Sequence, residues 1–203
     1  MRRIAALVFP GFELLDLYGP LEMFGLCPDD FSITLVSEHS GPVASRAGPA
    51  SLAELPLDDA IGHEILLVPG GPGTREEVDN EALTGWIAAA AAKAEIVASV
   101  CTGAALLARA GLLDGRRATT NKRAWAWATG QGPKVDWQAE ARWVADGNLW
   151  TSSGVAAGTD MSLALIAELL GQETAEATAN HAEYNWQRDP GRDPFAALYG
   201  LTG

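Results

Sequence analysis

Short apolar runs alternate along this chain with longer segments in which apolar residues recur at helical spacing. The apolar runs lie at residues 4–9, 31–37, 65–68 and 96–100, and the helical patterns at residues 14–24, 80–94, 107–110 and 161–170. Because strands that alternate with helices form a mostly parallel sheet covered on both faces, the pattern predicts an α/β fold. A chain of 203 residues can bury a substantial core, and we predict a single domain over residues 1–203.

The residues between these segments predict turns, hairpins and helix ends. Asp146-Gly147-Asn148 separates two β-type runs and predicts a hairpin, and the Gly- and Pro-rich residues 41–52 predict a smaller one. We expect Gly19-Pro20 to interrupt the first helical segment. A final helix is expected over residues 173–186, followed by a loop-like tail from Asp189.

Composition excludes several classes of function. The formal net charge of −12 argues against a nucleic acid partner, because phosphate binding needs a basic face. Two cysteines are too few for a disulfide framework, and no Cys/His pair has zinc-site spacing, so we expect no metal. No apolar stretch is long enough to cross a membrane and the N-terminus lacks a signal-peptide pattern, so we expect no membrane partner and a cytoplasmic protein.

Cys101 is the first candidate for chemistry. It directly follows a run of apolar and β-branched residues, and the residues after it are small enough for a sharp strand-to-helix turn. A thiol at a helix N-terminus faces unpaired N–H groups and the positive end of the helix dipole, which predicts a lowered pKa for Cys101. The same N–H groups can stabilise negative charge on an intermediate. The alternative is a buried structural cysteine, which is our interpretation of Cys27.

Two further segments fall after strands that end at the same sheet edge. Asp16 stands among leucines, where a carboxylate is unfavourable unless it is paired or has a chemical task, although a helix cap explains it equally well. The glycines of residues 69–73 let the backbone approach a ligand closely, or simply form a tight turn. Because sites in parallel sheets lie at the carboxyl ends of the strands, we expect these segments to converge with Cys101.

Five segments together resemble the ThiJ/PfpI superfamily, at residues 15–20, 68–71, 99–103, 111–120 and 153–160. The resemblance implies a flavodoxin-like, doubly wound fold related to class I glutamine amidotransferases, with the cysteine at a nucleophile elbow. An aspartate before Leu-x-Gly-Pro and a Cys-Thr-Gly elbow are most similar to the isocyanide hydratase branch of that superfamily.

The resemblance also implies roles for individual residues. Cys101 matches the nucleophile and Asp16 the acidic residue that acts with it. Thr102 matches the residue whose backbone N–H and hydroxyl face the substrate, and Gly71 matches an oxyanion contact. Candidate pocket residues are Gly70, Asn121, which stands where many relatives carry histidine, and Trp125, for which core packing is the alternative.

The function implied by the resemblance is hydration of an isocyanide to an N-formamide, with a small-molecule substrate, no cofactor and a homodimeric assembly. One alternative is glyoxalase or deglycase activity, which uses the same cysteine on a carbonyl. A non-catalytic redox sensor built on Cys101 is another. Similar motifs occur in the ligand-sensing domains of AraC-type regulators, but we expect this chain to be too short for their DNA-binding helices.

Overall fold

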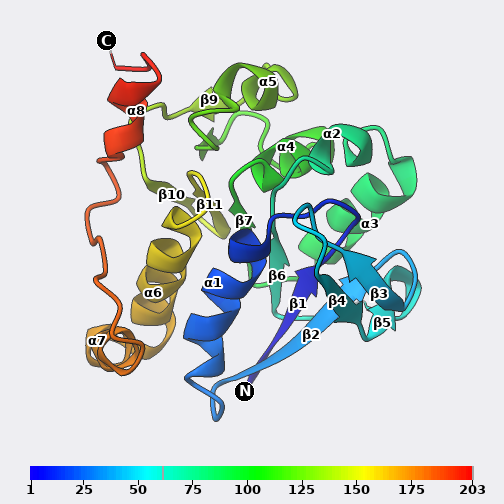
Figure 1. Cartoon of the computed structure of the whole chain (residues 1–203), viewed down its shortest axis with the longest axis horizontal. Helices are drawn as coiled ribbons and strands as arrows, with labels where there is room; N and C mark the ends of the chain where they lie inside the picture. The colour runs from blue at the N-terminus through cyan, green and yellow to red at the C-terminus, as the bar shows by residue number, and fades with distance from the viewer. Residues whose placement is uncertain (61, 203) are drawn as a thin grey trace.

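The structure is a computed structural model that describes residues 1–60 and 62–202. Its centre is a seven-stranded sheet with the order β10-β11-β7-β6-β1-β2-β5 (Figure 1). All neighbouring strands in it are parallel except β10, which pairs antiparallel with β11. The strands are β1 (Arg2–Leu7), β2 (Phe31–Ser37), β5 (Leu55–Pro56), β6 (Ile65–Val68), β7 (Ile96–Val100), β10 (Trp143–Asp146) and β11 (Leu149–Ser152). The mostly parallel sheet predicted from the sequence is thereby confirmed.

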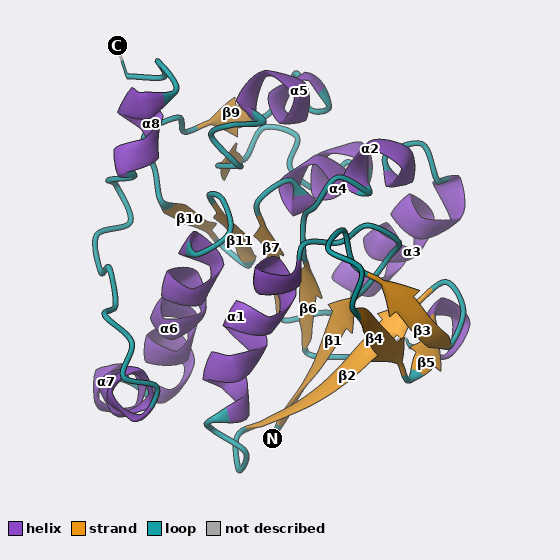
Figure 2. Cartoon of the chain, in the orientation of Figure 1, coloured by secondary structure: helices purple, strands orange, loops and turns teal. Residues whose placement is uncertain are grey.

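Helices cover both faces of this sheet (Figure 2). The chain moves one way across the sheet from β1 to β2 and the other way from β6 to β7 and β11. Right-handed crossovers therefore place the connecting helices on opposite faces. One face carries α1 (Leu14–Gly25), α6 (Ala157–Leu170) and α7 (Gln172–His181), and the other carries α2 (Thr74–Glu77), α3 (Glu81–Ala91) and α4 (Gly103–Arg109).

Smaller elements complete the architecture. The hairpin expected within residues 41–52 is formed by β3 (Gly41–Ala44) and β4 (Ala50–Ala53). A short parallel pair joins β8 (Arg117–Ala118) to β9 (Asp136–Trp137). The remaining pieces are η1 (Leu57–Asp59), α5 (Trp125–Gly130) and α8 (Pro194–Leu198).

Three expectations about the helices differ from the structure. Helix α1 continues through Pro20, because its apolar face is buried and Gly19 lets it pack closely against Thr159 of α6. The last long helix ends at His181, since Glu183 adopts a left-handed backbone with φ of 49°. The tail is not all loop: Asp193 caps α8 by accepting a hydrogen bond from the N–H of Phe195 at 3.0 Å.

The carboxyl ends of β1, β6, β7 and β11 meet at one edge of the sheet. The crossover direction reverses between β1 and β6, and ligands in open α/β sheets bind at such a switch point. In the part of the chain that the structure describes, no helix has the length and apolar character needed to span a bilayer.

Candidate active site

Cys101 forms the turn between β7 and α4 with a φ of 59°, a left-handed conformation that is strained for a side chain bearing a Cβ. Its N–H lies 3.2 Å from the carbonyl oxygen of Ser152 and 3.1 Å from that of Ser153, and its own carbonyl accepts from the Thr120 hydroxyl at 2.8 Å. Gly103 follows so close to the β6 loop that a Cβ there would lie 2.8 Å from the Pro69 carbonyl oxygen. These contacts hold the strained elbow expected from the sequence.

Hydrogen-bond donors surround the sulfur of Cys101. The Asn121 side-chain amide donates to Sγ at 3.1 Å, and the backbone N–H groups of Thr102 and Val155 also point to the sulfur. Asn121 cannot easily rotate, because its Oδ1 accepts from the N–H of Ala124 at 2.8 Å. Val155 has a φ of 43°, a second strained residue beside the elbow. The site is therefore built to stabilise negative charge on sulfur or on an atom bonded to it.

Asp16 lies fully buried in the first turn of α1, with its carboxyl group beside Cys101. Oδ2 accepts from the N–H of Gly70 at 3.0 Å, and Oδ1 has no hydrogen-bond partner among the described residues. Burial raises the pKa of Asp16 to about 7, against smaller opposing effects of the Cys101 side chain and the Gly70 N–H. Glu13, not Asp16, occupies the N-cap position, so the structure does not use Asp16 as a helix cap.

The Cys101 thiol has a raised pKa, which is opposite to the direction expected from the helix N-terminus. Burial is the main cause, the charge of Asp16 is the second, and the donors around the sulfur offset only part of both. The elbow helix α4 has seven residues and its dipole acts on a thiol that water scarcely reaches. Cys101 and Asp16 therefore lie close enough for the charge of Asp16 to raise the pKa of the Cys101 thiol.

Thr102 and Gly71 are engaged with each other. The Gly71 N–H donates to Thr102 Oγ1 at 3.0 Å, and the Thr74 hydroxyl donates to the same oxygen at 3.1 Å. The Thr102 hydroxyl thus holds the β6 loop against the elbow, and the expectation that Thr102 faces the substrate stays a prediction. The N–H of Gly71 is likewise already used, so the donors around Cys101 come from Thr102, Val155 and Asn121.

A cavity of about 580 Å³ opens over the Cys101 sulfur, a size typical of small-molecule sites. Asn121, Gly71 and Thr102 line it, as does Val155. Two of the candidate pocket residues, Gly70 and Trp125, do not line the cavity. Gly70 sits behind the wall and positions Asp16, and a Cβ at residue 70 would lie 2.8 Å from Asp16 Oδ2.

Trp125 is the other candidate outside the wall. It packs edge-on against Trp137 with ring centroids 6.2 Å apart, and the ammonium of Lys122 lies 5.1 Å from its ring. Trp125 is half-buried and belongs neither to the cavity wall nor to the buried core of the described residues, and it contacts the core through Trp137.

The C-terminal tail supplies wall residues that sequence reasoning missed. Phe195 of α8 and Tyr199 just after it line the cavity, although they follow Cys101 by about a hundred residues. An Asp-Pro pair at residues 193–194 is the signal that could have revealed a helix here, since Asp favours the N-cap and Pro the first turn.

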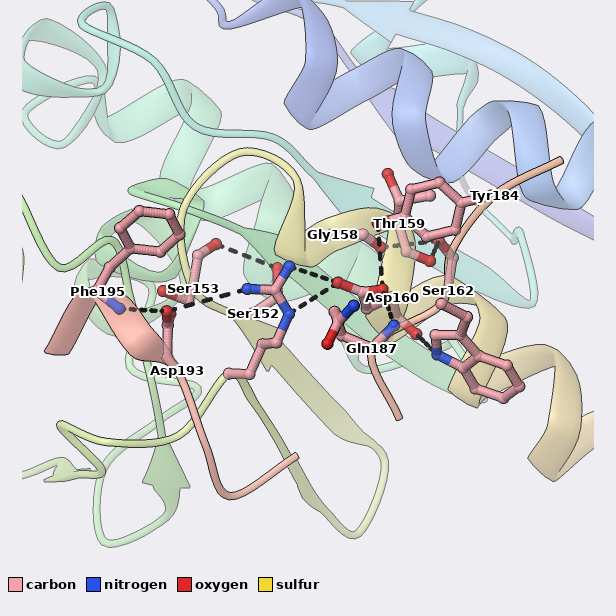
Figure 3. Close-up of polar contacts among 12 residues, drawn as sticks. Ser152, Ser153, Gly158, Thr159, Asp160, Ser162, Tyr184, Gln187, Asp193 and Phe195 are labelled. Carbon is pink, nitrogen blue, oxygen red and sulfur yellow. Dashed lines mark hydrogen bonds and ion pairs between the residues drawn. The ribbon is translucent and has the colours of Figure 1, made fainter. Parts of the chain in front are cut away.

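A buried polar network fixes this tail to the body of the protein (Figure 3). Arg142 donates through Nε to Asp160 Oδ2 at 2.7 Å, and its Nη1 lies 3.9 Å from Asp193 Oδ1. Asp160 Oδ1 accepts from the Tyr184 hydroxyl at 3.1 Å and from the Gln187 N–H at 2.9 Å. The network holds the extended tail and ends at the cap of α8, which places Phe195 and Tyr199 at the cavity.

A strained cysteine between a central parallel strand and a helix defines the class of α/β proteins that are built around a nucleophile elbow. The family model described as DJ-1/PfpI matches residues 2–168. The chain therefore belongs to the DJ-1/PfpI family, as its motifs predicted.

Two relatives support this assignment. The chain is 37% identical over 187 residues to an isonitrile hydratase of Pseudomonas putida, a match that covers 90% of this chain and 78% of that protein. The structure aligns with the crystal structure of a ThiJ/PfpI family protein from Pseudomonas syringae with a TM-score of 0.84 at 34% identity, covering 92% of this chain and 76% of that one. The flavodoxin-like fold is thereby confirmed as well.

A third relative belongs to another functional class. The chain is 28% identical over 203 residues to the HTH-type transcriptional regulator CdhR of Pseudomonas aeruginosa. That match covers 97% of this chain but 60% of the regulator. Family membership alone therefore includes both enzymes and regulators, and the choice between them depends on the site.

Proposed function

We propose that the protein hydrates an isocyanide to an N-formamide, with Cys101 as nucleophile and Asp16 as the group that carries protons. The observation that carries this proposal is the buried pair itself: a thiol beside a carboxyl group whose pKa lies at about 7. A group with such a pKa gives and takes protons equally well at neutral pH. Within the described residues, no histidine lines the cavity to replace it.

The first half of the reaction forms a thioimidate. The Asp16 carboxylate takes the Sγ proton as the sulfur attacks the terminal carbon of the isocyanide, so that a C–S bond forms. That carbon then holds an electron pair, and Asp16 returns the proton to it, giving R–N=CH–S–Cys101. The N–H groups of Thr102 and Val155 and the Asn121 amide stabilise the charge on sulfur while it lasts.

The second half uses one water molecule. Water adds to the thioimidate carbon, Asp16 removes a proton from it, and the nitrogen gains a proton. The C–S bond then breaks, the sulfur recovers a proton, and R–NH–CHO leaves. The sum is one isocyanide and one water converted to one N-formamide, and the thiol and the carboxyl group return to their starting states.

Assay of the purified protein with cyclohexyl isocyanide, with N-formamide measured by chromatography, tests the proposal. We expect turnover by the wild type and none by Cys101→Ser, because a hydroxyl beside a carboxyl group of this pKa is not ionised. Absence of turnover across a panel of isocyanides would contradict the proposal. Consumption of methylglyoxal in the same samples would then support the glyoxalase alternative.

Ligand sensing without turnover is a second candidate, and the similarity to the regulator CdhR favours it. It predicts that small molecules bind in the cavity and protect Cys101 from alkylation while no product forms. The same isocyanide panel therefore distinguishes the two functions.

A further inference from the structure

The mouth of the cavity over Cys101 is basic, although the protein as a whole is acidic. Arg46, Arg75, Lys122 and Arg123 line it, and the Lys122 amine donates to the Thr119 hydroxyl and the Ala141 carbonyl. Glu13 is the one carboxylate among the lining residues that the structure describes, and it pairs with Arg46 at 3.2 Å. Acidic residues outnumber basic ones by 26 to 14 in the chain, so the overall composition does not explain a local excess of positive charge.

Arg75 and Arg123 have no carboxylate partner within ion-pair distance among residues 1–60 and 62–202. Eight of the chain's 14 basic residues do form ion pairs in this part of the structure. Of the six that do not, three lie at this cavity: Arg75, Lys122 and Arg123. The unpaired cations thus gather at the site.

Arg75 is also held in place. Its guanidinium carbon lies 4.6 Å from the centroid of the Trp127 ring, so the cation packs over the aromatic side chain. The side chain of Arg75 makes no hydrogen bond or ion pair with the described residues, so its N–H groups are available, and a guanidinium can bind a carboxylate through two of them. Arg123 follows Asn121, the residue that contacts the sulfur, by two positions in the same loop.

We propose that Arg75 and Arg123 bind a carboxylate on the substrate, so that the site takes isocyanides that carry an anionic group. The inference deepens the proposed function and rests on it for the reacting group. A protein with a net charge of −12 repels anions at long range, and a cationic mouth overcomes this repulsion locally. The isocyano group then reaches Cys101 at the base of the cavity while the carboxylate stays at the rim.

The first test compares isocyanoacetate with its methyl ester, which has the same reacting group but no charge. The measured quantity is the acid-to-ester ratio of kcat/KM at low ionic strength. We expect Arg75→Gln/Arg123→Gln to lower this ratio about five- to tenfold, which is the effect of losing partly exposed charge pairs. Lys93→Gln, which removes an exposed charge away from the cavity, is the matched control and is expected to leave the ratio within about twofold of wild type.

The salt dependence of the acid-to-ester ratio is a second test of the same charge contacts. Raising NaCl to about 0.5 M shortens the screening length to a few ångströms and should lower the wild-type ratio toward that of the double variant. A wild-type ratio that neither the double substitution nor salt lowers would overturn the inference, even if both isocyanides are hydrated.

Alkylation of Cys101 separates failure of this inference from failure of the proposed function. Iodoacetate carries the carboxylate and iodoacetamide does not, and neither needs turnover. We expect the iodoacetate-to-iodoacetamide rate ratio at Cys101, followed by peptide mass, to fall about fivefold in the double variant and to stay near the wild-type value in Lys93→Gln. If neither isocyanide is hydrated, the proposed function fails, and this ratio still supports or overturns the carboxylate site.

Discussion

At the level of single residues, the proposed chemistry depends on one proton that Cys101 and Asp16 share. We predict that Asp16→Asn lowers kcat for isocyanide hydration by about 10² to 10⁴-fold, the usual contribution of general acid–base catalysis. The amide cannot accept the thiol proton or deliver it to carbon. Steady-state kinetics with cyclohexyl isocyanide measure the loss, and slow alkylation of Cys101 by iodoacetamide shows that the thiol is still present and accessible. Equal turnover by the variant and the wild type would remove Asp16 from the mechanism.

The raised pKa of Asp16 also predicts how stability depends on pH. Between the ordinary aspartate pKa of 3.8 and about 7, the folded protein binds a proton that the unfolded chain has lost. The contribution of Asp16 to the free energy of unfolding therefore decreases as pH rises through this window, by on the order of 4 kcal/mol in total. Asparagine stays neutral at every pH, so Asp16→Asn should be the more stable protein at about pH 8 and nearly equal to wild type at about pH 4.

Urea unfolding of both proteins at the two pH values measures this difference directly. The comparison cancels the other titrating groups, because they are common to both chains. A variant that is less stable than wild type at the higher pH would show that the Asp16 carboxylate is stabilised in the folded protein, and the raised pKa would then be wrong.

Asn121 provides the side-chain hydrogen bond to the sulfur, 3.1 Å in length. We predict that Asn121→Ala lowers kcat/KM for isocyanides about 10- to 100-fold, because a hydrogen bond to a charged atom contributes about 1.5–3 kcal/mol. Asn121→Asp keeps the acceptor for the Ala124 N–H but places negative charge beside the sulfur, so it should be at least as impaired while retaining the fold. Kinetics for both variants, with circular dichroism as the control, test the prediction, and an Asn121→Ala enzyme of normal kcat/KM would contradict it.

At the level of elements, α8 and the polar network that holds it shape the cavity. We predict that Asp193→Ala raises KM for bulky isocyanides more than for small ones, because it removes the α8 cap, worth about 1 kcal/mol, and one of the two carboxylates that pair with Arg142. Phe195 and Tyr199 then lose their fixed positions in the wall. Asp189→Ala is the matched control, since Asp189 is exposed and, among the described residues, its side chain bonds only the nearby Gly191 N–H.

Limited proteolysis gives an independent measurement of the same change. The tail of Asp193→Ala should be cleaved faster than that of wild type, whereas Asp189→Ala should be cleaved at the wild-type rate. An unchanged ratio of KM values for bulky and small isocyanides in Asp193→Ala would show that α8 does not select substrates.

Local patterns predicted the parallel core well, since most of its strands are short apolar runs, as in ILLV of β6, that need no distant information. The strands at residues 31–37, 65–68 and 96–100 have the predicted bounds. The errors lie where tertiary contacts override local signals. Burial against α6 keeps α1 helical through Pro20, which locally favours an interruption. The left-handed backbone of Glu183 ends α7, although the sequence after it still favours a helix.

The candidate site divides in the same way. Cys101 and Asp16 could be predicted to meet, because both follow parallel strands whose carboxyl ends share an edge. The raised pKa of Cys101 could not be predicted, because it depends on burial and on a carboxyl group 85 positions earlier in the chain. The use of the Thr102 hydroxyl by Gly71, and the reach of Phe195 and Tyr199 across the cavity, likewise require three-dimensional positions.

At the level of the whole molecule, we propose a homodimer, as the resemblance to the family implies. Two large side chains on α1, Leu15 and Tyr18, are 45% and 44% exposed and lie three positions apart, so they share one face of the helix. Single exposed apolar residues are common on monomers, so this pair does not establish an interface but identifies where a mutation should test for one.

We predict that light scattering at micromolar concentration gives twice the chain mass of 21.3 kDa. If α1 lies in the interface, Leu15→Glu should shift the protein toward the monomer, because it would bury an unpaired charge. Leu52→Glu is the control, since Leu52 is 65% exposed and lies on β4, outside that helix face. A monomeric wild type would contradict the homodimer. A dimer that neither substitution affects would place its interface away from α1.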